Sequence, residues 1–401
     1  MSAYLDHAAT TPMLPEAVEA MVDELGRVGN ASSLHTSGRR ARRVVEEARE
    51  ALAAAVGSGP SEVIFTSGGT EADNLAVKGL FWARQAGRPR PRIIVSTVEH
   101  HAVLDPVEWL AKEAGADFHW IGVDELGRVR LRELEAALAE DPDGVALVSV
   151  MWANNEVGTV QPISEVVALA HRHGVPVHSD AVQALGQLPL GFAASGVDCL
   201  TVSAHKVGGP TGAGALIARR GLDLVPVQHG GGQERGVRSG TLDAPAVRAF
   251  AVAAGLAAAR QPETADQVAR LRDAAIDAIL VAVPDAVLCG DPQPAGRLPG
   301  NAHFTFPGCE GDSLLYLLDA RGVECSTGSA CQAGVPQPSH VLVAMGVGPG
   351  VARGALRFSF GHSSTEADVD ALAGAIGPAV ARARRAGLAA PSSRPASGAG
   401  G

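Results

Sequence analysis

VPVHSDAVQ (Val175–Gln183) and CLTVSAHK (Cys199–Lys206) are two short β-rich runs that each end in polar side chains. Three further runs of this kind occur in the chain: RIIVST (92–97), GVALVSVMW (144–152) and GALIAR (214–219). Helical patterns follow two of them, HAVLDPVEWLAKEAG (101–115) and PISEVVALAHRHG (162–174). Alternating strands and helices predict an α/β fold whose mainly parallel mixed sheet is covered on both faces. Polar residues at the strand ends should then meet in one crevice.

The chain has 401 residues, more than one hydrophobic core usually holds. A Gly-rich loop, HGGGQERGVRSGT (229–241), leads into an Ala-rich helical region that reaches about Val283. Shorter runs beyond it predict a smaller α+β domain: NAHFTF (301–306), GDSLLYLLDARG (311–322), GVEC (322–325) and ALRFSF (355–360). We therefore expect a large domain over 15–260 and a small domain over 1–14 and 261–386. The low-complexity tail, 387–401, is predicted to be disordered.

Composition narrows the classes of function. A net charge of -10 argues against a general nucleic-acid binder, so no direct nucleic-acid binding is expected. No apolar run approaches the ~20 residues of a membrane span, and the amino-terminal sequence does not resemble a signal peptide. We expect a cytoplasmic protein. The five cysteines are odd in number and contain no CxxC pair, which argues against a disulfide framework or a structural zinc site.

Lysine is rare in this chain, which narrows the search for a reactive amine. Lys78 and Lys112 lie in helical patterns, where a solvated amine is the ordinary expectation. Lys206 instead lies at the end of an apolar strand and before a Gly-rich turn. A partly desolvated lysine there is suited to form an imine with an aldehyde cofactor, although an ordinary surface lysine is the alternative.

Two other segments could hold parts of a cofactor. FTSGGTEADN (65–74) places Gly69 and Thr70 between a strand and a helix, where backbone N–H groups can bind a phosphate. An ordinary helix cap is the alternative reading. Asp180 could keep a pyridine nitrogen protonated and Gln183 could bond a ring oxygen, although Asp180 could equally be a structural cap.

The stretch CSTGSACQAG (325–334) contains two cysteines, Cys325 and Cys331, among small residues. The pair could form a disulfide or half of a metal site. Either residue could also be a buried side chain or a reactive thiol.

Nine motifs, taken in order, resemble those of the NifS/IscS-type cysteine desulfurases of the class V aminotransferase group: GNASSLH, FTSGGTEADN, EHHAVLD, NNEVG, HSDAVQ, SAHK, GGGQERGVRSGT, GSAC and LRFSFG. The resemblance runs from Tyr4 to about Ala386. It implies a pyridoxal 5'-phosphate (PLP) enzyme of fold type I that forms a homodimer.

The resemblance also implies roles for single residues. Lys206 would be the imine lysine, Asp180 would face the pyridine nitrogen and Gln183 the phenolic oxygen. His100 would stack on the ring and, with Lys206, transfer protons. The remaining implied positions are Gly69, Thr70, Ser203 and His205 around the phosphate, Thr241 at the other subunit's cofactor, Asn155 beside cofactor and substrate, Arg357 on the substrate carboxylate, and Asn30 in the substrate site.

Cys331 would accept the sulfur of L-cysteine as a persulfide, leaving L-alanine. A loop of Ser, Gly and Ala would let this thiol move, whereas Cys325 is expected to pack as a small hydrophobe. An iron–sulfur scaffold protein is the expected persulfide acceptor, and Cys331 could transiently ligate the cluster. The alternatives are a selenocysteine lyase, an aminotransferase, a role in tRNA thiolation, and a non-enzymatic scaffold.

Overall fold

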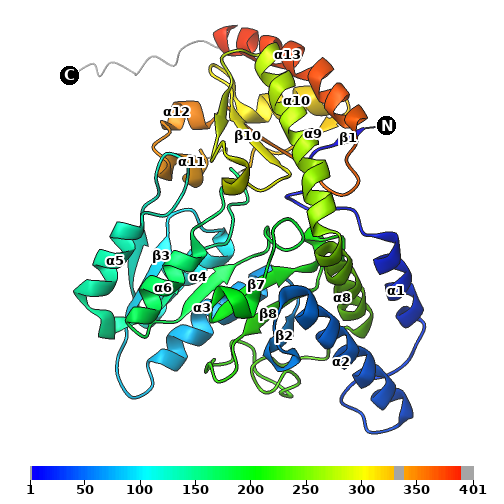
Figure 1. Ribbon diagram of the computed structural model, residues 1–401, viewed down its shortest axis with the longest axis vertical. Helices are drawn as coiled ribbons and strands as arrows, with labels where there is room; N and C mark the ends of the chain where they lie inside the picture. Colours follow the sequence, from blue (N-terminus) through cyan, green and yellow to red (C-terminus); the bar gives the residue numbers. More distant parts are fainter. Residues whose placement is uncertain (1, 329–337, 390–401) are drawn as a thin grey trace, which may run out of the picture.

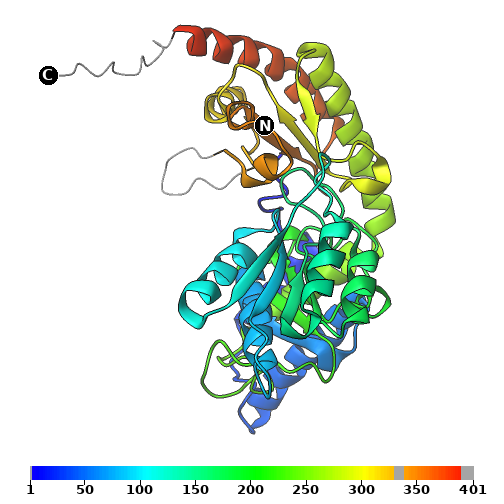
Figure 2. The ribbon, with the colours of Figure 1, turned by 90° about the vertical axis from the view of Figure 1, so that its left-hand side faces the viewer.

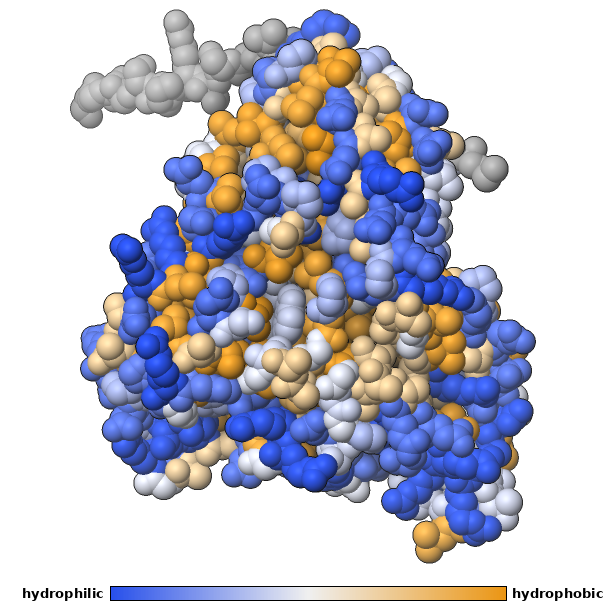
Figure 3. All heavy atoms as spheres, viewed as in Figure 1, coloured by the Kyte–Doolittle hydropathy of each residue, from blue (hydrophilic) through white to orange (hydrophobic). Residues whose placement is uncertain are grey.

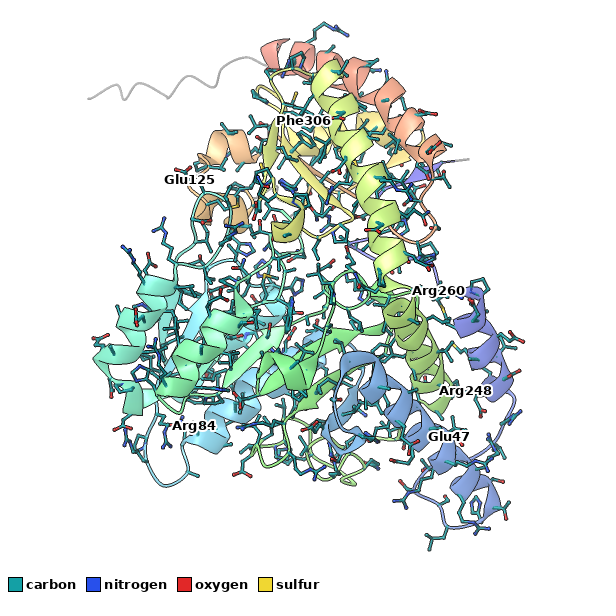
Figure 4. All side chains as sticks on the ribbon, viewed as in Figure 1. Glu47, Arg84, Glu125, Arg248, Arg260 and Phe306 are labelled. Atoms are coloured by element: carbon teal, nitrogen blue, oxygen red, sulfur yellow. The ribbon has the colours of Figure 1, made fainter. Side chains whose placement is uncertain are left out.

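The structure, a computed structural model, describes residues 2–328 and 338–389. Cys331 therefore lies outside the described residues. The chain forms a larger part and a smaller part, the latter at the top of Figure 1. The helices α8 (Ala244–Ala259) and α9 (Gln261–Ala282) run along one side and connect the two. Arg260 lies at the junction of these helices (Figure 4) and pairs with Glu16 at 3.0 Å.

A seven-stranded sheet forms the centre of the larger part. Its strands, in spatial order, are β2 (Val63–Thr66), β8 (Gly214–Ala218), β7 (Cys199–Ser203), β6 (Val177–Asp180), β5 (Val145–Ser149), β3 (Arg92–Ser96) and β4 (Asp117–Ile121). All neighbouring pairs are parallel except the two that β8 makes, which are antiparallel. The prediction of a mainly parallel mixed sheet is confirmed.

Helices cover both faces of this sheet because its strands bury side chains on both sides. Ile93 and Val95 contribute to one hydrophobic cluster and Ile94 to another, as the two-residue period of a strand requires. The first cluster includes α3 (Gly69–Arg84) and α4 (His101–Ala114), and the second includes α2 (Thr36–Val56) and α6 (Ile163–Arg172). The other helices of this part are α1 (Pro15–Leu25), α5 (Leu131–Glu140) and α7 (Phe192–Ser195).

The smaller part has two short sheets. Strands β12 (Ala355–Ser359), β10 (Asn301–Thr305) and β9 (Val287–Cys289) are antiparallel, and β1 (Ala3–Tyr4) pairs in parallel with β11 (Val323–Glu324). Its helices are α10 (Gly311–Asp319), α11 (His340–Ala344), α12 (Pro349–Ala352) and α13 (Glu366–Ala389). Figure 2 shows the smaller part after a rotation of 90°. Phe306, labelled in Figure 4, lies in a separate hydrophobic core here. Helix α13 ends at Ala389, inside the range 387–401 that was predicted to be a tail. The domain boundaries themselves stay a prediction.

The surface in Figure 3 is mixed, with hydrophobic side chains gathered in several small groups. One group covers the lower right tip, over the connection between α1 and α2. Within residues 2–328 and 338–389, every helix is too short or too polar to cross a bilayer.

Candidate active site

A cavity of about 410 Å³ lies beside the ends of β6 and β7. This is the crevice that the alternation of strands and helices predicts. Ten of the predicted site residues line it: Gly69, Thr70, His100, Asn155, Asp180, Gln183, Ser203, His205, Lys206 and Arg357. The fold thus brings together residues that are spread over most of the chain.

Lys206 reaches the cavity from a single 3-10 turn, Ala204–Lys206, directly after β7. Its Nζ donates hydrogen bonds to the backbone carbonyls of Ala8 and Ala9, both at 2.6 Å. Burial, followed by the nearby Arg357 cation, lowers the pKa of Lys206 to about 8. The amine is therefore much more readily deprotonated than an ordinary lysine.

Asp180 is the last residue of β6, is buried and lines the cavity. Its Oδ1 accepts a hydrogen bond from the backbone N–H of Val182 at 2.9 Å. Burial, followed by repulsion from Asp73, raises the pKa of Asp180 to about 7. The surrounding protein therefore does not fully offset the cost of burying the negative charge of Asp180. A protonated nitrogen in the cavity would stabilise that charge.

The start of α3 provides the small residues that a phosphate requires. An ideal Cβ at Gly69 would lie 3.0 Å from Cγ2 of Val182, so a side chain would crowd this wall. The hydroxyl of Ser203 is buried and lacks a hydrogen-bond partner among the described residues. A hydroxyl left in this way is expected to bind a further polar group.

His100 and His205 are both neutral near pH 7. His100 caps α4, with its Nδ1 accepting from the N–H of Ala102 at 3.1 Å. Burial and then the Lys206 cation lower the pKa of each imidazole to about 4. A neutral ring can stack on an aromatic group or exchange a proton without placing a second cation beside Lys206.

Arg357 enters the cavity from β12 in the smaller part. It donates to the carbonyl of Asn155 and to the Asp6 carboxylate, each at 2.8 Å. A guanidinium held at two points presents its remaining surface in a fixed direction, which suits recognition of a carboxylate.

These observations fit PLP. A lysine with a lowered pKa suits its aldehyde, a buried carboxyl suits its ring nitrogen, and an unpaired hydroxyl with small residues at a helix start suits its phosphate.

The four described cysteines differ in position but share one property. Burial raises the pKa of the Cys325 thiol to about 12 and that of Cys289 to about 11, and it also raises the pKa values of Cys199 and Cys309. All four are free thiols. None of them is suited to form a thiolate near pH 7.

Two predicted residues do not line the cavity in the described chain. Thr241 is exposed, and Asn30 is exposed with its Oδ1 accepting from the N–H of Ser32 at 2.9 Å. Their predicted roles stay predictions.

Two acidic residues at the site, Asp6 and Asp73, are not among the residues that the sequence predicts. Asp6 precedes Ala8 and Ala9 in the segment YLDHAATTP (4–12), whose chemistry gives no sign of a distant arginine partner. Asp73 lies within FTSGGTEADN, the motif considered for phosphate binding. An acidic residue early in a helix is ordinarily explained by its favourable interaction with the helix dipole, so it gives no sign of a role in the site.

Comparison with known proteins agrees with this geometry. The family model for class-V aminotransferases matches residues 3–372. The chain is 58% identical to the IscS-like cysteine desulfurase of Mycobacterium tuberculosis over 97% of its own length and 98% of that protein. It also resembles a solved NifS-like protein, with 34% identity, a TM-score of 0.87 and coverage of 95% and 100% of the two chains. A structure described as SspA in complex with cysteine has 31% identity, a TM-score of 0.77 and coverage of 91% and 100%.

The match in sequence extends over nearly the whole chain, and the solved NifS-like protein shares its overall fold over 95% of this chain. The chain belongs to the class-V aminotransferase family, among the PLP-dependent cysteine desulfurases of the IscS/NifS type.

Proposed function

We propose that this enzyme converts L-cysteine to L-alanine, and that the sulfur leaves as a persulfide on Cys331 to supply iron–sulfur cluster assembly. The relatives named IscS support the reaction and the pathway. The observation that most strongly supports this proposal is that Lys206, Asp180 and Arg357 line the same cavity.

PLP, when bound, supplies an electron sink for negative charge at the substrate α-carbon. Lys206 would hold its aldehyde carbon, Asp180 its ring nitrogen and Gln183 its phenolic oxygen. Gly69, Thr70, Ser203 and His205 would surround the phosphate.

Arg357 would bind the substrate carboxylate, with Asn155 beside it. Lys206 Nζ, once unprotonated, would take the proton from the α-carbon, and its lowered pKa supports this role. His100 is the second candidate for proton transfer, since its neutral ring lines the same cavity.

Cys331 would attack the substrate sulfur as a thiolate. The new S–S bond forms as the C–S bond breaks, and the bonding electrons stay with the β-carbon, which becomes the methyl group of L-alanine after protonation. The raised pKa values of the four described cysteines support Cys331 as the reacting thiol, because the other thiols resist ionisation. An iron–sulfur scaffold protein is the proposed acceptor, and Cys331 could ligate the cluster during transfer.

A homodimer in the cytoplasm is the proposed form. Four apolar side chains on α1 or in the connection between α1 and α2 are at least 60% exposed, which is a pattern typical of an interface: Val22, Leu25, Val28 and Leu34. Thr241 would then reach the partner's cofactor and Asn30 a substrate site. Sedimentation equilibrium of wild type and Leu25→Glu tests this assembly: we expect a dimer in wild type and a weakened one in the variant, and a monomeric wild type would contradict it.

The decisive test incubates PLP-reconstituted protein with L-cysteine and measures sulfide and alanine. We expect equal amounts of both products in the presence of a reductant, and none from Lys206→Ala. A wild-type protein that gains no visible absorption with PLP, or that releases no alanine, would contradict the proposed function.

A further inference from the structure

His303 is a completely buried histidine in the central strand of the smaller part, β10. Both of its ring nitrogens lack a hydrogen-bond partner among the described residues. Buried polar groups are nearly always paired in native proteins, so a side chain with two unpaired nitrogens points to an interaction made in the working enzyme.

The neighbour of His303 across the sheet is Arg357. These residues are directly opposite in the antiparallel pair β10–β12, so their side chains lie on the same face with Cβ atoms about 5 Å apart. The Nε of Arg357 is itself buried and without a partner in the described part of the chain. An unpaired donor therefore lies beside an unpaired acceptor.

Gly328 bounds His303 on the side of the cavity. An ideal Cβ at Gly328 would lie 3.2 Å from Nε2 of His303, so the backbone passes close to the ring. Gly328 and Arg357 both line the candidate active site. The imidazole thus lies directly behind the wall to which Arg357 belongs.

The charge state of His303 is set by its surroundings. Burial, followed by the Arg357 and Arg297 cations, lowers the pKa of His303 to about 3. The ring is consequently neutral at physiological pH, with one nitrogen available as an acceptor.

We propose that His303 is a positioning residue that accepts the Nε–H of Arg357, directly or through one water molecule, and so orients the guanidinium for the substrate carboxylate. This inference rests on the proposed function, in which Arg357 binds L-cysteine. His303 itself is not among the residues that line the cavity.

The test compares His303→Leu, which removes the acceptor, with His303→Asn, which keeps a polar side chain. In PLP-loaded protein we expect His303→Leu to raise KM for L-cysteine about tenfold, as for one lost hydrogen bond to a charged group, with kcat changed less than about twofold. His303→Asn should recover part of the loss. Equilibrium binding of the product L-alanine, followed by the cofactor absorption, should weaken by the same factor as KM rises.

Cys289→Ala is the matched control, because Cys289 is opposite His303 on the other neighbouring strand. It should change thermal stability without changing KM. If His303→Leu does not fold, His303→Met takes its place, since methionine fills irregular spaces.

A double-mutant cycle with Arg357→Lys distinguishes positioning from general packing. If His303 acts through Arg357, the double variant should have nearly the KM of Arg357→Lys alone. An unchanged KM in His303→Leu, fully additive effects, or an equal KM increase in Cys289→Ala would overturn the proposal. Failure of the proposed function is a different result, because wild type would then form no alanine.

Discussion

Asp6 accepts a hydrogen bond from Nη2 of Arg357 at 2.8 Å, although 351 positions separate the two residues in sequence. Asp6 follows β1, and Arg357 lies in β12. The Arg357 side chain is 5% exposed and that of Asp6 is 21% exposed. This pair therefore couples the amino-terminal segment to the cavity wall.

Asp6→Asn tests that coupling. Removing the carboxylate charge leaves a nearly buried guanidinium uncompensated, which we expect to lower the free energy of unfolding by about 1–3 kcal/mol, less than for a fully buried pair because Asp6 is partly exposed. KM for L-cysteine should rise because Arg357 loses one of its two anchors. Urea unfolding and steady-state kinetics measure both effects, and Asp124→Asn, in a turn that does not line the cavity, serves as the control. Unchanged stability and unchanged KM would contradict a role for the pair.

The lowered pKa of Lys206 predicts the pH dependence of PLP uptake. Only the unprotonated amine reacts with an aldehyde, so the rate at which apoprotein gains the visible cofactor absorption should increase from pH 6.5, reach half of its maximum near pH 8 and level off above about pH 9. An ordinary lysine would give a rate that still increases beyond about pH 10. A rate that does not vary across this range would show that Lys206 is not the titrating group.

The same shift has a consequence for stability. The pKa of Lys206 is lower in the folded protein than in the unfolded chain, so the unfolded chain binds more protons between about pH 8 and pH 10.5. The Lys206 contribution to the free energy of unfolding should therefore increase with pH in this window. Lys206→Met apoprotein, compared with wild type by urea unfolding, should lack that increase. A constant difference between the two proteins from pH 7 to pH 10 would contradict it.

Cys331 and Cys325 should behave differently toward an alkylating reagent. Burial raises the pKa of Cys325 to about 12, so we expect iodoacetamide to leave this thiol unmodified in the native protein and to label Cys331. Cys331→Ser should form no persulfide, whereas Cys325→Ala should keep desulfuration within about threefold of wild type. Peptide mass spectrometry and alanine production are the measurements. Undiminished persulfide in Cys331→Ser would remove Cys331 from the mechanism.

The sequence was informative where local patterns decide the structure. The apolar runs that became β3, β5, β6 and β7 are buried on both faces, and such strands are recognisable by composition alone. The reversal of β8 was not predictable in this way, because a five-residue apolar run carries no information on its direction.

In the site, too, local sequence patterns predict some residues and not others. Lys206 and Asp180 could be singled out because each follows a strand, and strand ends of a parallel sheet converge. The contacts of Arg357 with Asp6 and His303 depend on how the smaller part pairs its strands. Register between strands far apart in sequence is set by packing and turn geometry, which no local pattern contains.

Asp180→Asn should separate stability from function. Burial raises the pKa of Asp180 to about 7, so the folded apoprotein binds more protons than the unfolded chain between about pH 4 and pH 7, and its carboxyl group makes the fold less stable as pH rises through that window. The asparagine variant lacks this penalty, and at pH 8 its apoprotein should be at least as stable as wild type toward urea. It should nevertheless desulfurate L-cysteine far more slowly, because a neutral amide does not hold a ring nitrogen in its protonated form. A variant that is both less stable at pH 8 and fully active would show that Asp180 is a structural residue, the reading that its place at the end of a strand left open.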